Sequence, residues 1–296
     1  MGIVPAEDMC MSDFWQVLTD PQMPFLRYAL IAGILTSLPL GVVGAFVVVR
    51  RISYLAAAIS HAVLGGIGGA LYCQSAFGWD WFSPLLGAVI AAILAAVIMG
   101  CVHLYAQQRE DTVIGAIWSL GMAIGLLLIH MTPGYNDGMS YLFGDILIIA
   151  KADLYITAVL SVGMLLLVGL YYKELLAVTY DVEFAELRGV PVKRFYFLLL
   201  GLTSLTVVLM VSLVGIVLVI ALLTLPAGIA AHFSRKLWQM MAGAVLLCAC
   251  LSTGGVLISY AGDMPTGPCI IVVTGLAYLT VVLGCALANR KAAGQA

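Results

Sequence analysis

The feature that most constrains this chain is its series of apolar runs, each nearly free of charge and long enough to cross a lipid bilayer. These runs lie at 26–49, 53–73, 84–105, 113–131, 153–171, 195–213, 214–232, 237–260 and 268–288. A helix needs about 20 apolar residues to cross the hydrocarbon core, where the backbone must satisfy its own hydrogen bonds. The sequence therefore predicts an all-α fold, a polytopic membrane helical bundle of about nine transmembrane helices, with eight as the other possible count.

The least defined boundary lies between the sixth and seventh runs, because no charged residue separates them. The turn must fall near Ser212 to Gly215, at or within the membrane. Two alternatives remain open for 195–232, namely a hairpin of two spans and a single broken helix. Irregular backbone at this depth requires protein or a water-lined cavity to satisfy its polar groups.

The remaining residues are too few for a second domain, so residues 1–296 are expected to form a single transmembrane domain. Residues 1–24 read as an interfacial N-terminal segment: Phe14 and Trp15 give it an apolar side, and two prolines end it. Only 9% of the residues are charged, and they are dispersed among the loops. Nucleic acid is therefore not an expected partner.

The lysines and arginines indicate the orientation of the chain. If the connection at 50–52 is cytoplasmic, eleven of the thirteen basic residues lie on that side, and only Arg27 and Lys151 lie outside. Cytoplasmic loops of membrane proteins carry such an excess of positive charge. We therefore expect a multi-pass protein of the cell (inner) membrane with its N-terminus outside and its C-terminus in the cytoplasm. This arrangement needs an odd number of crossings, which nine satisfies.

One stretch, RRISYLAAAISHAVLGGIGGA at 50–70, places a titratable ring at membrane depth. At helical spacing His61 shares a narrow face with Ala57, Gly65 and Gly69, and such small residues let another helix pack closely. A polar ring at this depth usually faces a bundle interior or a water-filled path. Two roles stay open for His61, a ligand on a translocation path and a ring held by a structural hydrogen bond.

The most charged stretch is the loop at 173–194, which contains DVEFAELRGV. Asp181 and Glu183 suit the start of a short helix, Ala185 lies in its middle, and Gly189 provides a C-terminal stop. One interpretation is an ordinary amphipathic linker. The other is a docking helix, which a membrane subunit needs when its energy source is another chain.

Pro226, in the seventh run, removes a backbone hydrogen bond and predicts a helix break. Such a discontinuity suits a pore or gate, although proline is also frequent in ordinary membrane helices.

Several catalytic motifs are missing, which disfavours an enzyme. The chain has no G-x-x-x-x-G-K-[ST], no H-E-x-x-H and no G-x-S-x-G. It is therefore not expected to bind a nucleotide by itself. An ion channel or secondary carrier, working without a partner ATPase, remains an alternative class.

Several blocks of the chain resemble a known family of transporters. E-x-A-x-x-x-G in the 173–194 loop is similar to the coupling-helix motif of ATP-binding-cassette importer permeases, and RRISYLAAAISHAVLGG resembles the signature of their zinc, manganese and iron permease family. Four further blocks resemble that family in the same order: EDTVIGAIWSLGMAIGLLL, YLFGDILIIAKADL, VGIVLVIALLTLPAGIA and GDMPTGPCIIVV. One departure is clear, because the common pattern has an aspartate four residues before the histidine and this chain has Ala57.

The resemblance implies a permease subunit that carries a divalent transition-metal ion (zinc, manganese or iron) into the cytoplasm by alternating access. Its implied partners are a cytosolic ATP-binding subunit, an extracytoplasmic metal-binding protein and a second permease subunit. No permanently bound cofactor is implied, because the metal ion is the cargo. His61 is the residue of the Asp–His pair that carries over, and the coupling loop is represented by Asp181, Glu183, Ala185 and Gly189.

Overall fold

A computed structural model describes residues 24–105, 110–133, 142 and 151–293. The described helices are α2 (Pro24–Val49), α3 (Ser53–Phe77), α4 (Pro84–Tyr105), α5 (Glu110–Met131), α7 (Lys151–Leu170), α8 (Tyr172–Tyr180), α9 (Val182–Leu187), α10 (Val192–Val214), α11 (Ile216–Phe233), α12 (Leu237–Gly262) and α13 (Thr266–Ala293). The expected interfacial segment at 1–24 lies outside the described residues, apart from Pro24 at the start of α2.

The helices match the predicted apolar runs and confirm an all-α membrane bundle. Eight of them are long and apolar enough to span a bilayer: α2, α3, α4, α5, α10, α11, α12 and α13. The fifth predicted run corresponds to α7, which passes the same test together with α8, and these two helices are bent by 72° where they meet. The described part of the chain thus holds eight spans, or nine when the bent pair counts as one.

Gly215 separates the sixth and seventh predicted runs. Its backbone has φ 85° and ψ 162°, and it lies between the end of α10 and the start of α11. A side chain is strongly disfavoured at that φ, so glycine suits this turn. Residues 195–232 therefore form two helices, each with the length and apolarity of a membrane span.

Helix α3 packs closely against the helices on two of its sides. A Cβ placed on Gly66 would lie 2.1 Å from the Gly87 carbonyl oxygen of α4, and one placed on Gly68 would lie 2.5 Å from the Gly125 carbonyl oxygen of α5. Only glycine leaves room for backbones this close. These two glycines lie outside the face predicted for close packing, where Gly65 does approach α5 and Gly69 has no atom within 4 Å of an added Cβ.

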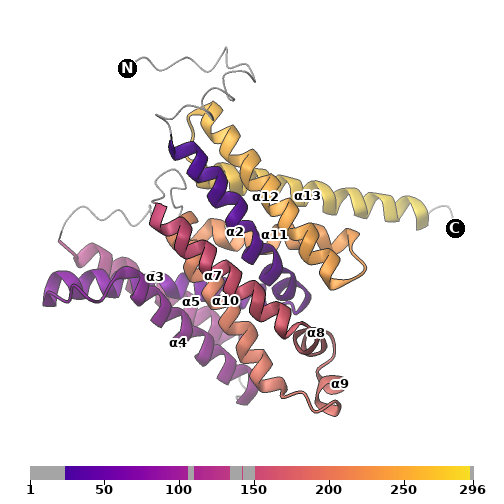
Figure 1. Cartoon of the computed structure of the whole chain (residues 1–296), viewed down its shortest axis with the longest axis horizontal. Coiled ribbons are helices and arrows are strands. Elements are labelled where there is room, and N and C mark those ends of the chain that lie inside the picture. Colours follow the sequence, from indigo (N-terminus) through magenta and orange to yellow (C-terminus); the bar gives the residue numbers. More distant parts are fainter. Residues whose placement is uncertain (1–23, 106–109, 134–141, 143–150, 294–296) are drawn as a thin grey trace.

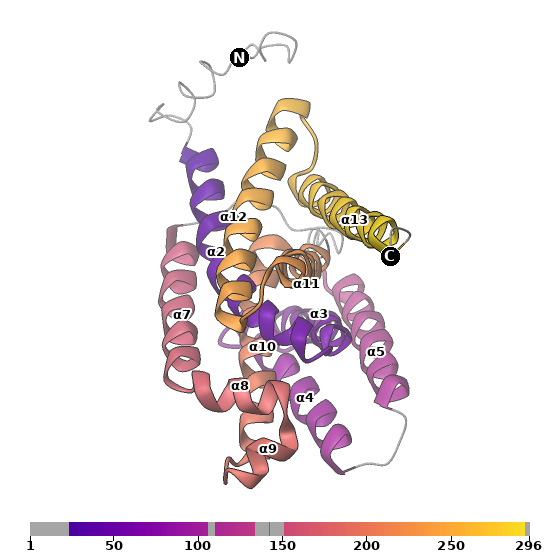
Figure 2. The ribbon, with the colours of Figure 1, turned by 90° about the vertical axis from the view of Figure 1, so that its right-hand side faces the viewer.

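The connection between α7 and α10 lies at one end of the bundle. Helices α8 and α9 form a compact unit that is far from the beginning of α2 in both views (Figures 1 and 2). The α2–α3 turn lies at this same end, since the Arg50 guanidinium donates a hydrogen bond to the Val178 carbonyl oxygen of α8. The arrangement places the predicted coupling loop beside the start of the helix that carries His61.

Candidate functional site

His61 lies on the buried side of α3, against α5. Its side chain is 7% exposed. The imidazole stacks on the indole of Trp118, with ring centroids 4.6 Å apart and an interplanar angle of 16°. Its Nδ1 atom is buried and makes no hydrogen bond within the described residues. Since buried polar atoms usually have partners, this nitrogen calls for an explanation that packing alone does not provide.

The face shared by Ala57, His61, Gly65 and Gly69 changes character along α3. Ala57 is buried, and a Cβ on Gly65 would lie 3.0 Å from the Gly121 carbonyl oxygen of α5. At Gly69 no atom comes within 4 Å of such a Cβ. The face is therefore a helix contact near His61 and has free space two turns further on.

Within the described residues, no group of three or more His, Cys, Asp or Glu side chains could hold a metal ion. Serine hydroxyls on α3 and α5 are other possible ligands, but they donate hydrogen bonds to their own helices. Ser60 donates to the Ala56 carbonyl oxygen at 2.9 Å, and Ser119 donates to that of Gly115 at 2.8 Å. His61 is thus the strongest ligand at this depth of α3, and a metal ion there would not be held by a cluster of His, Cys, Asp and Glu side chains of the described residues.

The predicted docking segment forms a short helix, α9, whose ends are set by the expected residues. The Asp181 carboxylate accepts a hydrogen bond from the Phe184 backbone N–H at 2.9 Å and so caps the helix. Gly189 follows its C-terminal end with φ 76°. Ala185 is fully buried against Val178 and Val192, while Glu183 on the same helix is exposed.

The outer side of α9 carries large apolar side chains. Phe184 is 47% exposed and Leu187 is 88% exposed. This helix is not among the candidate membrane spans. An exposed apolar patch on a short, well-capped helix is typical of a protein interaction site.

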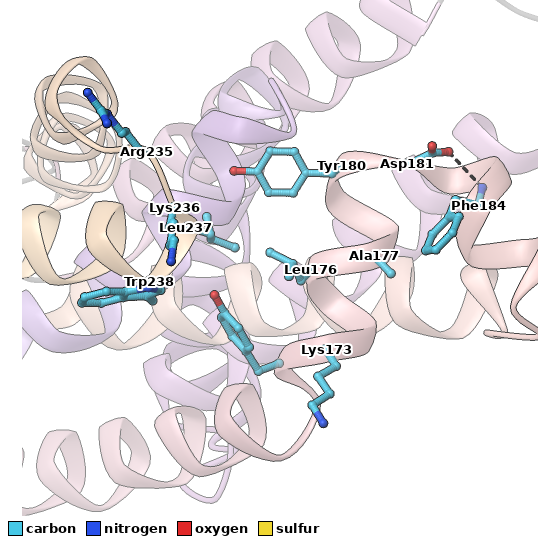
Figure 3. Close-up of a pocket in the computed structure, with 11 residues that line it drawn as sticks. Lys173, Leu176, Ala177, Tyr180, Asp181, Phe184, Arg235, Lys236, Leu237 and Trp238 are labelled. Carbon is cyan, nitrogen blue, oxygen red and sulfur yellow. Dashed lines mark hydrogen bonds between the residues drawn. The ribbon is translucent and has the colours of Figure 1, made fainter.

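A cavity of about 610 Å³ lies beside this helix, between α8, α9 and the start of α12. Its wall includes Leu176, Tyr180 and Trp238. Figure 3 shows the Tyr180 hydroxyl pointing across the cavity, while Lys173 and Arg235 point away from its centre. The cavity wall includes Phe184 and so continues the apolar surface of α9. Lys173, Arg235 and Lys236 place positive charge around the cavity.

Pro226 does not produce the expected helix break. Helix α11 continues through it from Ile216 to Phe233, and the interruption in this part of the chain falls at Gly215. A proline removes one backbone hydrogen bond, which a buried helix with many packing contacts can tolerate, whereas the conformation at Gly215 cannot continue a helix. Pro226 is buried in the bundle.

Trp118 has a place in this site that sequence reasoning missed. It lies in the EDTVIGAIWSLGMAIGLLL block, where it is the only ring. The available signal was a single large aromatic residue in the middle of the apolar part of this block. The contact between Trp118 and His61 could not be predicted from the sequence, because the two residues belong to different helices.

Comparisons with known proteins place the chain in a family. Residues 22–284 match the ABC 3 transport family. The chain is 38% identical over 256 residues to the "Probable metal transport system membrane protein" of Chlamydia muridarum, covering 86% of this chain and 87% of that protein. It is 32% identical over 258 residues to the "Manganese import system permease protein ScaB" of Streptococcus parasanguinis, covering 87% of this chain and 90% of that one.

A solved structure shares the fold at almost full length. This structure, PsaBC from Streptococcus pneumoniae in complex with Fab, superposes with a TM-score of 0.80 and 30% identity over 92% of this chain and 95% of the matched chain. The family match covers nearly all the described helices. This chain therefore belongs to the ABC 3 transport family and is a membrane permease, without a catalytic role of its own.

Proposed function

We propose that this permease carries a divalent transition-metal ion, with Mn²⁺ as the first candidate, into the cytoplasm. The observation that carries the proposal is the similarity, over 87% of the chain, to a permease named for manganese import. A separate cytosolic subunit would hydrolyse ATP, an extracytoplasmic binding protein would deliver the ion, and two permeases would form the path between them.

His61 is the proposed ligand on this path. A neutral imidazole binds Mn²⁺, Fe²⁺ and Zn²⁺, and a transporter must bind its cargo weakly enough to release it. The buried Nδ1 without a hydrogen-bond partner supports this role over a purely structural one. Trp118 stacks on one face of the ring, which fixes the ring plane and therefore the direction in which its nitrogens point.

Helix α9 is the proposed docking site for the ATPase. Its exposed Phe184 and Leu187 offer apolar contacts, and its buried Ala185 ties the helix to the rest of the permease. A helix held on one side and apolar on the other can transmit a push from the ATPase to the membrane bundle.

The test is reconstitution of the complete importer in vesicles, with Mn²⁺ as the probe. We expect uptake that requires ATP, and we expect His61→Ala to abolish it while leaving expression and association with the ATPase unchanged. His232→Ala is a matched control, because His232 is exposed at the end of α11 and bonds the Gly228 carbonyl oxygen of its own helix.

The outcomes separate the candidate functions. Mn²⁺ uptake in vesicles that contain the permease without an ATPase would favour a channel or secondary carrier. Uptake that survives His61→Ala would remove His61 from the path. A loss of protein yield in that variant, in step with the loss of uptake, would make the ring structural.

A further inference from the structure

Arg50 lies where four helices meet, although it belongs to a short turn. The turn joins α2 to α3, and its backbone is tightly bonded: Arg50 N–H donates to the Phe46 carbonyl oxygen at 2.9 Å, and Ile52 N–H donates to that of Val47 at 3.0 Å. The next residue, Arg51, has φ 58°, so the chain reverses within two residues. A displacement of Arg50 is therefore passed on to the start of α3.

The side chain of Arg50 reaches the segment that precedes the docking helix. Its Nη1 donates to the Val178 carbonyl oxygen at 2.9 Å. Val178 lies in the last turn of α8, whose carbonyls lack donors from their own helix. A guanidinium satisfies such a group and also suits the negative end of the helix dipole.

Val178 is in turn packed against the docking helix. It is 1% exposed and forms a small buried cluster with Ala185 of α9 and Val192 of α10. A movement of α9 therefore reaches Val178 through direct packing, and it reaches Arg50 through the hydrogen bond at the Val178 carbonyl.

An aromatic pair holds the other side of the guanidinium. The Arg50 Cζ lies 5.6 Å from the centroid of the Tyr196 ring of α10, within cation–π range. Tyr196 is buried and stacks on His103 of α4, with ring centroids 4.6 Å apart. The guanidinium is thus confined between α8 and α10, which makes its position sensitive to movement of either helix.

We propose that Arg50 is the positioning residue that ties displacement of the docking helix to α3 and, through it, to His61. The inference rests on the proposed function and deepens it, because it names how the ATPase acts on the path. His61 lies on α3, which begins three residues after Arg50 at Ser53. A push on α9 moves Val178 through their direct packing. Arg50 moves with the Val178 carbonyl oxygen to which it is bonded, and the rigid turn then shifts α3 against Trp118 of α5.

The decisive measurement is the amount of Mn²⁺ taken up per ATP hydrolysed by the reconstituted importer. Arg50→Gln removes the charge and most of the donors, and Arg50→Lys keeps the charge without the planar fork. Arg51→Gln is the matched control, since Arg51 is the exposed neighbour in the same turn. We expect Arg50→Gln to keep ATPase association and hydrolysis while uptake per ATP falls about tenfold. Arg50→Lys should fall between it and the wild type, and Arg51→Gln should match the wild type.

The outcomes distinguish this inference from the proposed function. Unchanged uptake per ATP in Arg50→Gln would overturn the positioning role while leaving the proposed function intact. If the protein yield, the ATP hydrolysis and the Mn²⁺ uptake of Arg50→Gln all fall in proportion, Arg50 is a structural contact only. If Arg50→Gln does not accumulate, Arg50→Lys decides: a wild-type ratio overturns the inference and a lower ratio supports it. A wild-type importer that moves no divalent ion overturns both.

Discussion

Replacing Gly66 by alanine tests the close backbone contact that holds α3, the helix that carries His61. The added Cβ would lie 2.1 Å from the Gly87 carbonyl oxygen of α4. A carbon atom and a carbonyl oxygen need about 3.3 Å, so the two backbones would have to separate by about 1 Å. The obstructing atom belongs to the backbone, and no side-chain rotation can relieve the contact.

Two opposing terms set the size of the effect. Forcing an extra methyl group into a packed interior costs about 1–3 kcal/mol, because neighbouring atoms must shift and lose contacts. Alanine in a helix interior is better than glycine by about 0.5–1 kcal/mol. The net loss expected for Gly66→Ala is therefore at most about 2.5 kcal/mol and about 1 kcal/mol at the middle of the two ranges. Gly69→Ala is the matched control on the same helix, since nothing lies within 4 Å of its added Cβ.

The assay is unfolding of the purified permease in one detergent with increasing dodecyl sulfate, followed by the helical circular dichroism signal. Gly66→Ala should lower the midpoint, whereas Gly69→Ala should leave it unchanged or raise it. Opposite signs for two chemically identical changes on one helix can only come from their surroundings. Equal shifts in the two variants would refute the close α3–α4 contact.

Two further predictions concern the coupling loop and the orientation of the chain. Gly189→Val places a β-branched side chain at φ 76°, which costs about 1–2 kcal/mol and should weaken association with the ATPase in a pull-down of the complex. The control Gly169→Val lies inside α7 with open space around it and should leave this association unchanged. Equal association of both variants would count against α9 as the docking site. In a cysteine-free background, a membrane-impermeant thiol reagent applied to intact cells should label Trp81→Cys and leave Leu187→Cys unlabelled. Both positions are exposed, and the basic residues predict that they lie on opposite sides of the membrane. Labelling of Leu187→Cys alone would reverse the assigned orientation.

The features that sequence predicted well are those that depend on neighbours along the chain. Apolar length is such a property, and the nine predicted runs each correspond to a helix. The ends of α9 were also predictable, because an aspartate cap and a glycine stop act within one turn of themselves. Whether α9 docks an ATPase stays a prediction, since the helix alone does not name its partner.

The features that sequence reasoning missed depend on residues far apart in the chain. His61 and Trp118 belong to different helices, and their stacking follows from the glycine contacts that bring α3 and α5 together. Arg50 and Val178 are 128 residues apart. The helix break expected at Pro226 is absent, because the buried surroundings of α11 keep that helix continuous. The turn at Gly215, by contrast, lies within the stretch Ser212 to Gly215 where the sequence predicted it.

Ala57 gives the proposed path a distinctive character. It is 5% exposed and lies one turn before His61, at the position where the common family pattern has an aspartate. A buried carboxylate needs a cation or several donors, and an apolar methyl group needs neither. A path lined here by alanine and an imidazole can therefore be closed without a bound ion, with Trp118 stacked on His61. The absence of that carboxylate also lowers the attraction for a divalent cation, so tight binding would require the second permease to contribute its own His61. If two permeases form the path, holding the cargo depends on how the two subunits are brought together, and the coupling roles proposed for α9 and Arg50 would act on that step.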